Sequence, residues 1–408
     1  MLLKVDVIGN LKFMPKKIYI LIVFLIAFGF FNNTLTASVL NPDVTFIILL
    51  IWGIYGWILY VKYRNNPLNK WKNKRIFYWL MGIMLLSTLV PYFTYQQPII
   101  DTMISQRYNY AIVYLLIFLR IFPTENDFLY AIRICAYLSL LCWILSIFYP
   151  SLFVDSKDLM DTLDARRESA DIGFAAPGLI LAVFYLFIKT QKLFNHPTTK
   201  DVLIASLFML YIIAVQNRST IIGTLPFFIW GIIRMKTPKK KQLLFVCSIL
   251  IFLIIPFVSY IYDSLLRETQ LQLEDTNYNR WQALSLYLVE MKSDWFSIVL
   301  GNGVWSKTGE YLSLMLRSQF ERGTYISDIG WLGTYFYYGI FPILILLYFA
   351  VKAVITKIIP LYLKYFSLWL IFVPTIHIFL ILHWSSAIEF SFYFYLIMYY
   401  SSYKKYCN

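Results

Sequence analysis

The chain has 408 residues, of which 60% are hydrophobic and only 14% are charged, and its formal net charge is +14. About a quarter of the residues of a soluble domain are charged, so the composition excludes an ordinary soluble enzyme. The lysines and arginines stand in short clusters between apolar runs and form no continuous basic stripe, which argues against nucleic-acid binding. This pattern predicts an all-α, polytopic integral membrane protein.

The four cysteines point to neither a disulfide framework nor a metal site. Cys135, Cys142 and Cys247 lie inside apolar runs, Cys407 stands in the C-terminal tail, and no two cysteines are spaced as CxxC. Zinc sites and disulfide frameworks need thiols that are grouped or paired. We therefore expect no metal and no cofactor.

A helix needs about 20 residues to cross the hydrocarbon core. Apolar runs of about this length predict about twelve transmembrane helices in a single membrane domain that covers residues 1–408. The first run follows several lysines and could be a signal peptide, but we interpret it as an uncleaved first helix. The predicted spans are 18–38, 43–61, 76–94, 108–122, 128–149, 172–190, 202–217, 219–235, 243–262, 329–350, 365–383 and 387–401.

The orientation follows from the lysines and arginines of the connections, which favour the cytoplasmic side. With the N-terminus inside, nearly all of these cations fall in inner segments, for example the cluster 234–241. This alternation requires a tight outer turn at Gln216-Asn217-Arg218-Ser219-Thr220. Arg218 then lies at the membrane edge, where an ionisable side chain is either functional or a snorkelling anchor. Both termini are predicted to be cytoplasmic.

Residues 263–328 form a large external loop by the same alternation. The loop is too long for a simple connection, and its tryptophans and phenylalanines are untypical of disorder. Trp281, Leu284, Leu288, Met291 and Trp295 recur at helical spacing and predict an amphipathic helix, which could lie on the outer membrane surface or cover a cavity. Leu300-Gly301-Asn302-Gly303 predicts a turn in which the glycines adopt positive φ.

Arg280 falls in the first turn of that predicted helix. A cation at this end opposes the helix dipole, whereas a bound anion would be stabilised by both the arginine and the helix N-terminus. The alternative is a surface arginine that pairs with Glu274, Asp275 or a lipid headgroup. At the other end of the loop, Asp328 is either the N-cap of the next span or a functional carboxylate.

Three stretches together resemble the O-antigen polymerase and O-antigen ligase superfamily. They are the hairpin Asn217-Arg218-Ser219-Thr220, the loop motifs Asn279-Arg280-Trp281 and Leu300-Gly301-Asn302-Gly303, and the re-entry Ser327-Asp328-Ile329-Gly330-Trp331 with Tyr338-Gly339. The resemblance covers roughly residues 170–350. It implies a GT-C-like membrane fold in the bacterial cytoplasmic membrane.

The resemblance also implies a reaction. Polymerases of this family move a growing glycan from undecaprenyl diphosphate to the non-reducing sugar of another lipid-linked repeat unit, in O-antigen, capsule or exopolysaccharide synthesis. In the ligase branch a loop histidine is implicated, and residues 263–328 contain no histidine. The resemblance therefore favours a polymerase, which would act in the lipid bilayer beside a flippase and a chain-length regulator.

The leaving lipid diphosphate needs cations. By similarity to the family, we assign catalytic roles to Arg218 and Arg280, with Asp328 as the candidate base. Arg167, Arg317, Arg322 and Trp281 are candidate substrate-binding residues; Arg167 and Arg322 each precede a glycine at the spacing described for some polymerases.

Other functions remain open. The alternatives are an O-antigen ligase and a lipid-linked oligosaccharide flippase or other transporter. A transporter would show internal repeats and charges within its helices, and neither is evident in the sequence.

Overall fold

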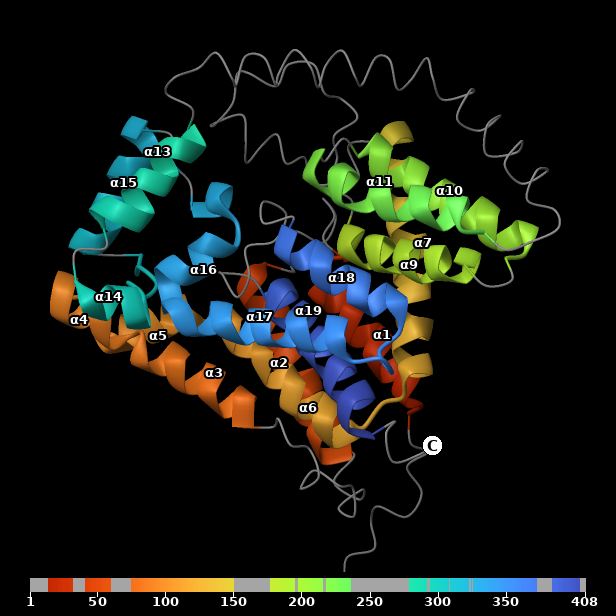
Figure 1. The fold of residues 1–408 in the computed structure, drawn as a ribbon. Helices are drawn as coiled ribbons and strands as arrows, with labels where there is room; N and C mark the ends of the chain where they lie inside the picture. The colour runs from red at the N-terminus through yellow and green to blue at the C-terminus, as the bar shows by residue number, and fades with distance from the viewer. Residues whose placement is uncertain are drawn as a thin grey trace, which may run out of the picture.

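The computed structural model describes residues 14–31, 41–59, 75–149, 177–194, 197–215, 218–235, 279–291, 294–307, 309–322, 324, 326–372 and 384–403. Every regular element in these ranges is a helix (Figure 1), so the predicted all-α class is confirmed for the described part of the chain. The predicted span 243–262 lies outside the described residues.

The described residues from 14 to 235 form eleven helices, of which η3 is a 3-10 helix. They are α1 (Lys16–Ala27), α2 (Pro42–Leu59), α3 (Arg75–Leu86), α4 (Leu89–Tyr95), α5 (Ile99–Ser105), η3 (Arg107–Val113), α6 (Tyr114–Ile121), α7 (Glu125–Phe148), α9 (Leu179–Phe194), α10 (Thr199–Ala214) and α11 (Arg218–Ile233).

The described residues from 279 to 403 form shorter elements, among them one 3-10 helix (η6) and two π-helices (η5 and η7). The elements are α13 (Asn279–Ser285), η5 (Leu286–Glu290), α14 (Trp295–Leu300), α15 (Glu310–Arg322), η6 (Ile326–Ile329), α16 (Trp331–Tyr338), α17 (Ile340–Ile355), α18 (Leu361–Phe372), α19 (Trp384–Met398) and η7 (Tyr399–Tyr403).

Two helical stretches among the described residues are long and apolar enough to cross a membrane, namely Arg75–Tyr95 and Glu125–Phe148. Four shorter apolar helices accompany them, at Pro42–Ile58, Thr220–Ile233, Ile340–Ile355 and Leu361–Ile371. These helices coincide with predicted spans and indicate association with a membrane. The count of about twelve spans stays a prediction.

Some predicted spans are divided in the structure. A turn at Ser87 and Thr88 separates α3 from α4, and Gly339 separates α16 from α17. Gly339 has a φ of +72°, a conformation that costs glycine little and other residues much more. The sequence window 329–350 was continuously apolar, and hydropathy alone does not reveal a break of this kind.

The helical body, defined as α1, α6, α7, α9, α18 and α19, is held together by aromatic side chains. α7 packs against α1 and α9, and α19 packs against α6 and η3. Phe128 of α7 is fully buried and contacts the rings of Phe24, Phe118 and Phe392. On the other side of α9, Phe184 meets Phe366 at a centroid distance of 4.6 Å. Such tilted and edge-to-face pairs add about 0.5–1.5 kcal/mol each beyond burial.

Polar contacts gather where the predicted inner ends of the helices meet. Lys16 Nζ donates to the carbonyl of Phe122 at 2.9 Å, and the guanidinium of Arg120 lies 4.0 Å from the ring centroid of Trp57. Tyr362 donates from its hydroxyl to Glu125 at 3.0 Å. All of these residues belong to segments, or to helix ends beside segments, that the charge pattern placed on the cytoplasmic side.

Candidate functional site

The motif-bearing segments of the predicted external loop come together in the structure. α13, which begins Asn279-Arg280-Trp281, packs against η6, which contains Ser327 and Asp328. The hydroxyl of the buried Tyr287 donates to the carbonyl of Thr324 at 3.1 Å and fixes η5 to the residues just before η6. The segment that contains α13 and η5 is therefore joined to the end of the loop, although some forty residues separate the two in the chain.

A second junction is made by residues 301–307, which we call the glycine strap. The strap has no regular secondary structure and lies beside the C-terminal half of α16. Asn302 N donates to the carbonyl of Phe336 at 2.7 Å, and Gly303 N donates to that of Tyr337 at 3.0 Å. Gly301 and Gly303 have φ of +80° and +64°. The predicted positive φ of both glycines is thus confirmed. The predicted turn is not, because residues 301–306 have no assigned turn.

Close approach explains why these positions are glycine. A Cβ on Gly301 would collide with the backbone of Tyr337, and a Cβ on Gly339 would collide with the carbonyl of Val299. The strap and the end of α16 therefore approach each other more closely than any side chain would permit. The glycines fix the position of this part of the loop relative to the re-entry helix.

Side-chain amides complete the strap's hydrogen bonding. Gln97, between α4 and α5, donates through Nε2 to the carbonyl of Val304 at 3.0 Å and accepts at Oε1 from Ser306 N at 2.8 Å. Asn302 Nδ2 donates to the carbonyl of Met291 at 3.0 Å. Burial raises the pKa of Tyr311, which keeps its hydroxyl protonated, and the hydroxyl donates to the carbonyl of Gly303 at 3.2 Å.

The 3-10 helix η3 brings further polar side chains to this region. Asn109 is fully buried, and its Nδ2 donates to the hydroxyl of Tyr338 at 2.5 Å. Gln106 is also fully buried and donates to the carbonyl of Met84 and to the hydroxyl of Tyr110. The remaining amide oxygens of both side chains find no hydrogen-bond partner among the described residues. These amides are the polar centre of an otherwise apolar neighbourhood.

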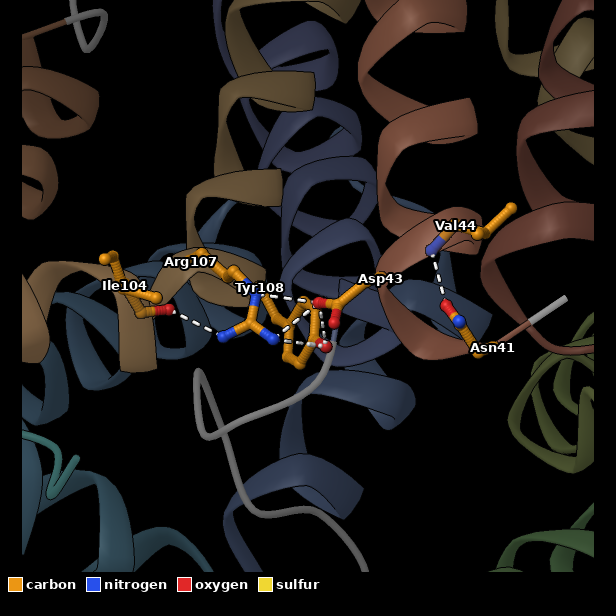
Figure 2. A network of polar contacts seen from close by, with 6 residues as sticks. All are labelled: Asn41, Asp43, Val44, Ile104, Arg107 and Tyr108. Atoms are coloured by element: carbon orange, nitrogen blue, oxygen red, sulfur yellow. Dashed lines mark hydrogen bonds and ion pairs between the residues drawn. The ribbon is translucent and has the colours of Figure 1, made fainter. Parts of the chain in front are cut away.

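A charged network lies at the start of η3, next to these amides in the chain (Figure 2). Arg107 donates through Nε to Asp43 at 2.9 Å and through Nη1 to the carbonyl of Ile104, while the hydroxyl of Tyr108 donates to the same carboxylate at 2.7 Å. Lys307, at the end of the strap, also acts electrostatically on Asp43. The residues come from three segments that the charge pattern placed on the outer side. Segments that were predicted to share one side of the membrane therefore lie together.

The predicted amphipathic helix differs from the observed one. It was expected to continue to Trp295, but η5 ends at Glu290, and Trp295 begins the separate helix α14. The π-helical turn of η5 adds a residue to the turn and shifts the register, and Leu286 and Tyr287 are buried. Trp295, on the separate helix α14, is exposed. A constant helical period could not reveal this shift.

Two predicted site residues lie on elements that pack together. Arg280 is the second residue of α13, and Asp328 lies in η6, which packs against α13. Trp281 follows Arg280, and Arg322 is the last residue of α15; the side chains of these four residues lie outside the described part. The backbone also corrects one interpretation of Asp328, because Gly330 and not Asp328 is the N-cap of α16.

The other predicted residues lie elsewhere. Arg218 begins α11, which packs against α9, α10 and α18, and its side chain is also outside the described part. Figure 1 shows α11 beside α10 on one side of the molecule and α13 with α15 on the other. Arg317 is exposed on α15, and Arg167 lies outside the described residues. The catalytic roles assigned to Arg218 and Arg280 stay predictions.

The side chains of the described residues include no group of three or more His, Cys, Asp or Glu residues that could hold a metal ion.

Comparison with protein-family models, with curated proteins and with solved structures finds no match to this chain. The class that the structure defines is an all-helical protein with apolar helices of membrane-spanning length. A more specific function can be argued only from the individual residues and their contacts.

Sequence reasoning missed Gln97, Gln106, Asn109 and the pair Asp43 and Arg107. One signal was present: Gln96-Gln97 and Gln106 flank Ile99-Ile100 and Ile104 in a stretch interpreted only as an outer connection. Polar residues beside an apolar turn could have indicated a folded segment there. The partners of Gln97 and Asn109 lie some 200 residues away in the chain and could not have been found from spacing.

Proposed function

We propose that the chain is an oligosaccharide repeat-unit polymerase of the bacterial cytoplasmic membrane. It would transfer a glycan from undecaprenyl diphosphate to the non-reducing sugar of another lipid-linked repeat unit, on the outer side of a multi-pass membrane domain. The substrate partner is thus a lipid-linked oligosaccharide, and no cofactor or metal is required by the proposal.

The observation that carries this proposal is the convergence of the polymerase-like motifs. Asn279-Arg280-Trp281 on α13 packs with the η6 segment that holds Asp328, and Leu300-Gly301-Asn302-Gly303 is hydrogen-bonded to the last turn of α16. Two of the three polymerase-like stretches thereby form one assembly, whereas Arg218 begins α11, which Figure 1 shows on the other side of the molecule. Similar motifs scattered by chance would have no reason to be joined in this way.

The proposed reaction breaks the bond between the anomeric carbon and the diphosphate oxygen and forms a bond from that carbon to an acceptor hydroxyl oxygen. Arg280 would stabilise the negative charge that develops on the departing lipid diphosphate, since guanidinium groups bind phosphate oxygens in pairs. Asp328 would accept the proton of the attacking hydroxyl. Arg218 is retained on its resemblance alone, and Arg167, Arg317, Arg322 and Trp281 are assigned to substrate binding.

The ligase and flippase alternatives are separated by one genetic experiment. Deleting the gene should leave single repeat units on the lipid carrier, exposed on the outer side of the membrane. Units that remain on the cytoplasmic side would instead indicate a flippase, and full-length polymer retained on the carrier would indicate a ligase.

Point variants expressed in the deletion strain then test the site. Arg280→Ala and Asp328→Ala should abolish the polymer while single lipid-linked units accumulate, and Arg280→Lys should restore it poorly because an ammonium group lacks the two-pronged contact. Arg133→Ala is the matched control, since Arg133 is an exposed arginine on α7, near the predicted inner side. Normal polymer from the Arg280→Ala variant would overturn the proposed mechanism.

A further inference from the structure

Two short helices at the outer end of the molecule have their apolar side chains outside and their polar side chains inside. On α5, Ile100 and Ile104 are 69% and 54% exposed, whereas Thr102 between them is fully buried. Ile100, Met103 and Ile104 follow the spacing of one helix face. This arrangement is the reverse of the one that a helix facing water adopts.

The same inversion occurs on α14, from a distant part of the chain. Trp295 and Phe296 are 64% and 50% exposed and stack on each other at a centroid distance of 3.8 Å, while Ser297 is buried. The hydroxyl of Ser297 donates to the carbonyl of Asp294 at 2.7 Å. The polar group of α14 is therefore satisfied inside the protein, and two large aromatic rings are left on its surface.

The two helices belong to one surface. α14 packs against α4, and α4 packs against α5, so the three helices are neighbours. Tyr92 and Phe93 of α4 are exposed as well. Figure 1 shows α4, α5 and α14 gathered at one edge of the molecule. We call this surface, formed by the exposed apolar side chains of α4, α5 and α14, the apolar foot.

The apolar foot continues into helix faces that are suited to lipid. α4 is the outer half of the membrane-span candidate Arg75–Tyr95, and α3, its inner half, exposes Tyr78, Trp79, Leu85 and Leu86. α14 also packs against α17, another apolar helix, which exposes Phe341, Leu344 and Val351. A contiguous apolar patch that faces water favours aggregation. Next to helices that are suited to lipid, the apolar foot instead extends their hydrocarbon-contacting surface.

We propose that the apolar foot is embedded in the outer leaflet of the bilayer and that its partner is lipid acyl chains. The external loop would then be anchored to the membrane by Trp295 and Phe296, since aromatic rings favour the membrane interface. Anchoring holds the strap and α13 at the height where a lipid-linked substrate carries its diphosphate. The lipid contact itself does not depend on the proposed reaction.

Accessibility of spin labels in proteoliposomes tests this proposal. Single cysteines replace Ile100 and Phe296 in a background in which the four native cysteines are changed to alanine, and each carries a nitroxide label. The measurement is the collision rate with oxygen, which concentrates in lipid, and with a neutral nickel chelate, which stays in water. Ile51→Cys on the exposed face of α2 is the lipid control, and Ser313→Cys on the exposed face of α15 is the water control.

The proposal requires both labels to behave like the label at position 51, with high oxygen and low nickel accessibility. Nickel accessibility like that at position 313 would show a water-exposed foot and overturn the proposal. Low accessibility to both reagents would show that protein covers the foot, for instance a second copy of the chain, and would overturn it equally. The labels at positions 100 and 296 lie on separate helices. If one behaves like the lipid control and the other does not, the two helices do not form a single embedded surface, and the proposal is contradicted.

Discussion

The helical body and the outer loop junctions are stabilised in different ways. In the body, fully buried rings such as Phe24, Phe128 and Phe392 pack without directional bonds. At the junctions, backbone groups and amide side chains bond across close approaches that depend on Gly301, Gly303 and Gly339. The body can accept many apolar sequences, whereas a few residues specify the junctions.

The largest effect is expected where the strap meets α16. Gly301→Val should add about 1–3 kcal/mol of backbone strain and about 1–3 kcal/mol of overpacking, because φ is +80° and a Cβ meets the backbone of Tyr337. We predict loss of polymer and a lower thermal midpoint in detergent. Gly82→Ala on α3 is the control, since no heavy atom lies within 4 Å of its added Cβ. Equal behaviour of the two variants would contradict the role of the strap.

In the body, Phe392→Ala should destabilise the protein by about 3–5 kcal/mol, as expected for a large buried ring. Phe392→Leu should cost much less because it retains most of the apolar volume. The two sites should differ in activity. At a temperature where the Phe392→Leu variant is folded, it should make polymer of normal length, whereas the Gly301→Val variant should not. Thermal unfolding in detergent and the glycan ladder in cells measure the two quantities separately.

Gln97 tests the amide bonds of the strap. Gln97→Ala leaves the buried N–H of Ser306 and the carbonyl of Val304 without this partner, at a cost of about 1–3 kcal/mol for a buried polar group. Gln96→Asn is the neighbouring control, because Gln96 is exposed and asparagine tolerates its positive φ. Shorter polymer from the Gln97 variant alone would support a positioning role; identical ladders would exclude one.

The smallest effect is expected at the exposed network of Figure 2. Arg107→Ala should reduce stability by no more than about 1 kcal/mol, since exposed ion pairs contribute little. The difference from the unsubstituted protein should shrink as salt concentration rises. Thermal midpoints at low and high salt measure this, and a large, salt-independent loss would mean that Arg107 does more than pair with Asp43.

The sequence predicted the helices of the body, because long apolar runs favour helices. Their placement in lipid and the assignment of their ends to two aqueous sides stay predictions. The sequence also located Arg280 and Asp328 on segments that the structure brings together. It did not predict the register shift in η5, the break at Gly339 or the partners of Gln97. These depend on one extra residue in a turn or on contacts between residues about 200 positions apart, and neither leaves a periodic trace.

The most direct test is reconstitution of the reaction. Purified protein in proteoliposomes is supplied with the single lipid-linked repeat units extracted from the deletion strain, and the products are separated by size. The proposal predicts a ladder of lengthening glycans with release of free undecaprenyl diphosphate, and no ladder from Arg280→Ala. Units that stay single, or that only cross the bilayer, would contradict the assignment as a polymerase.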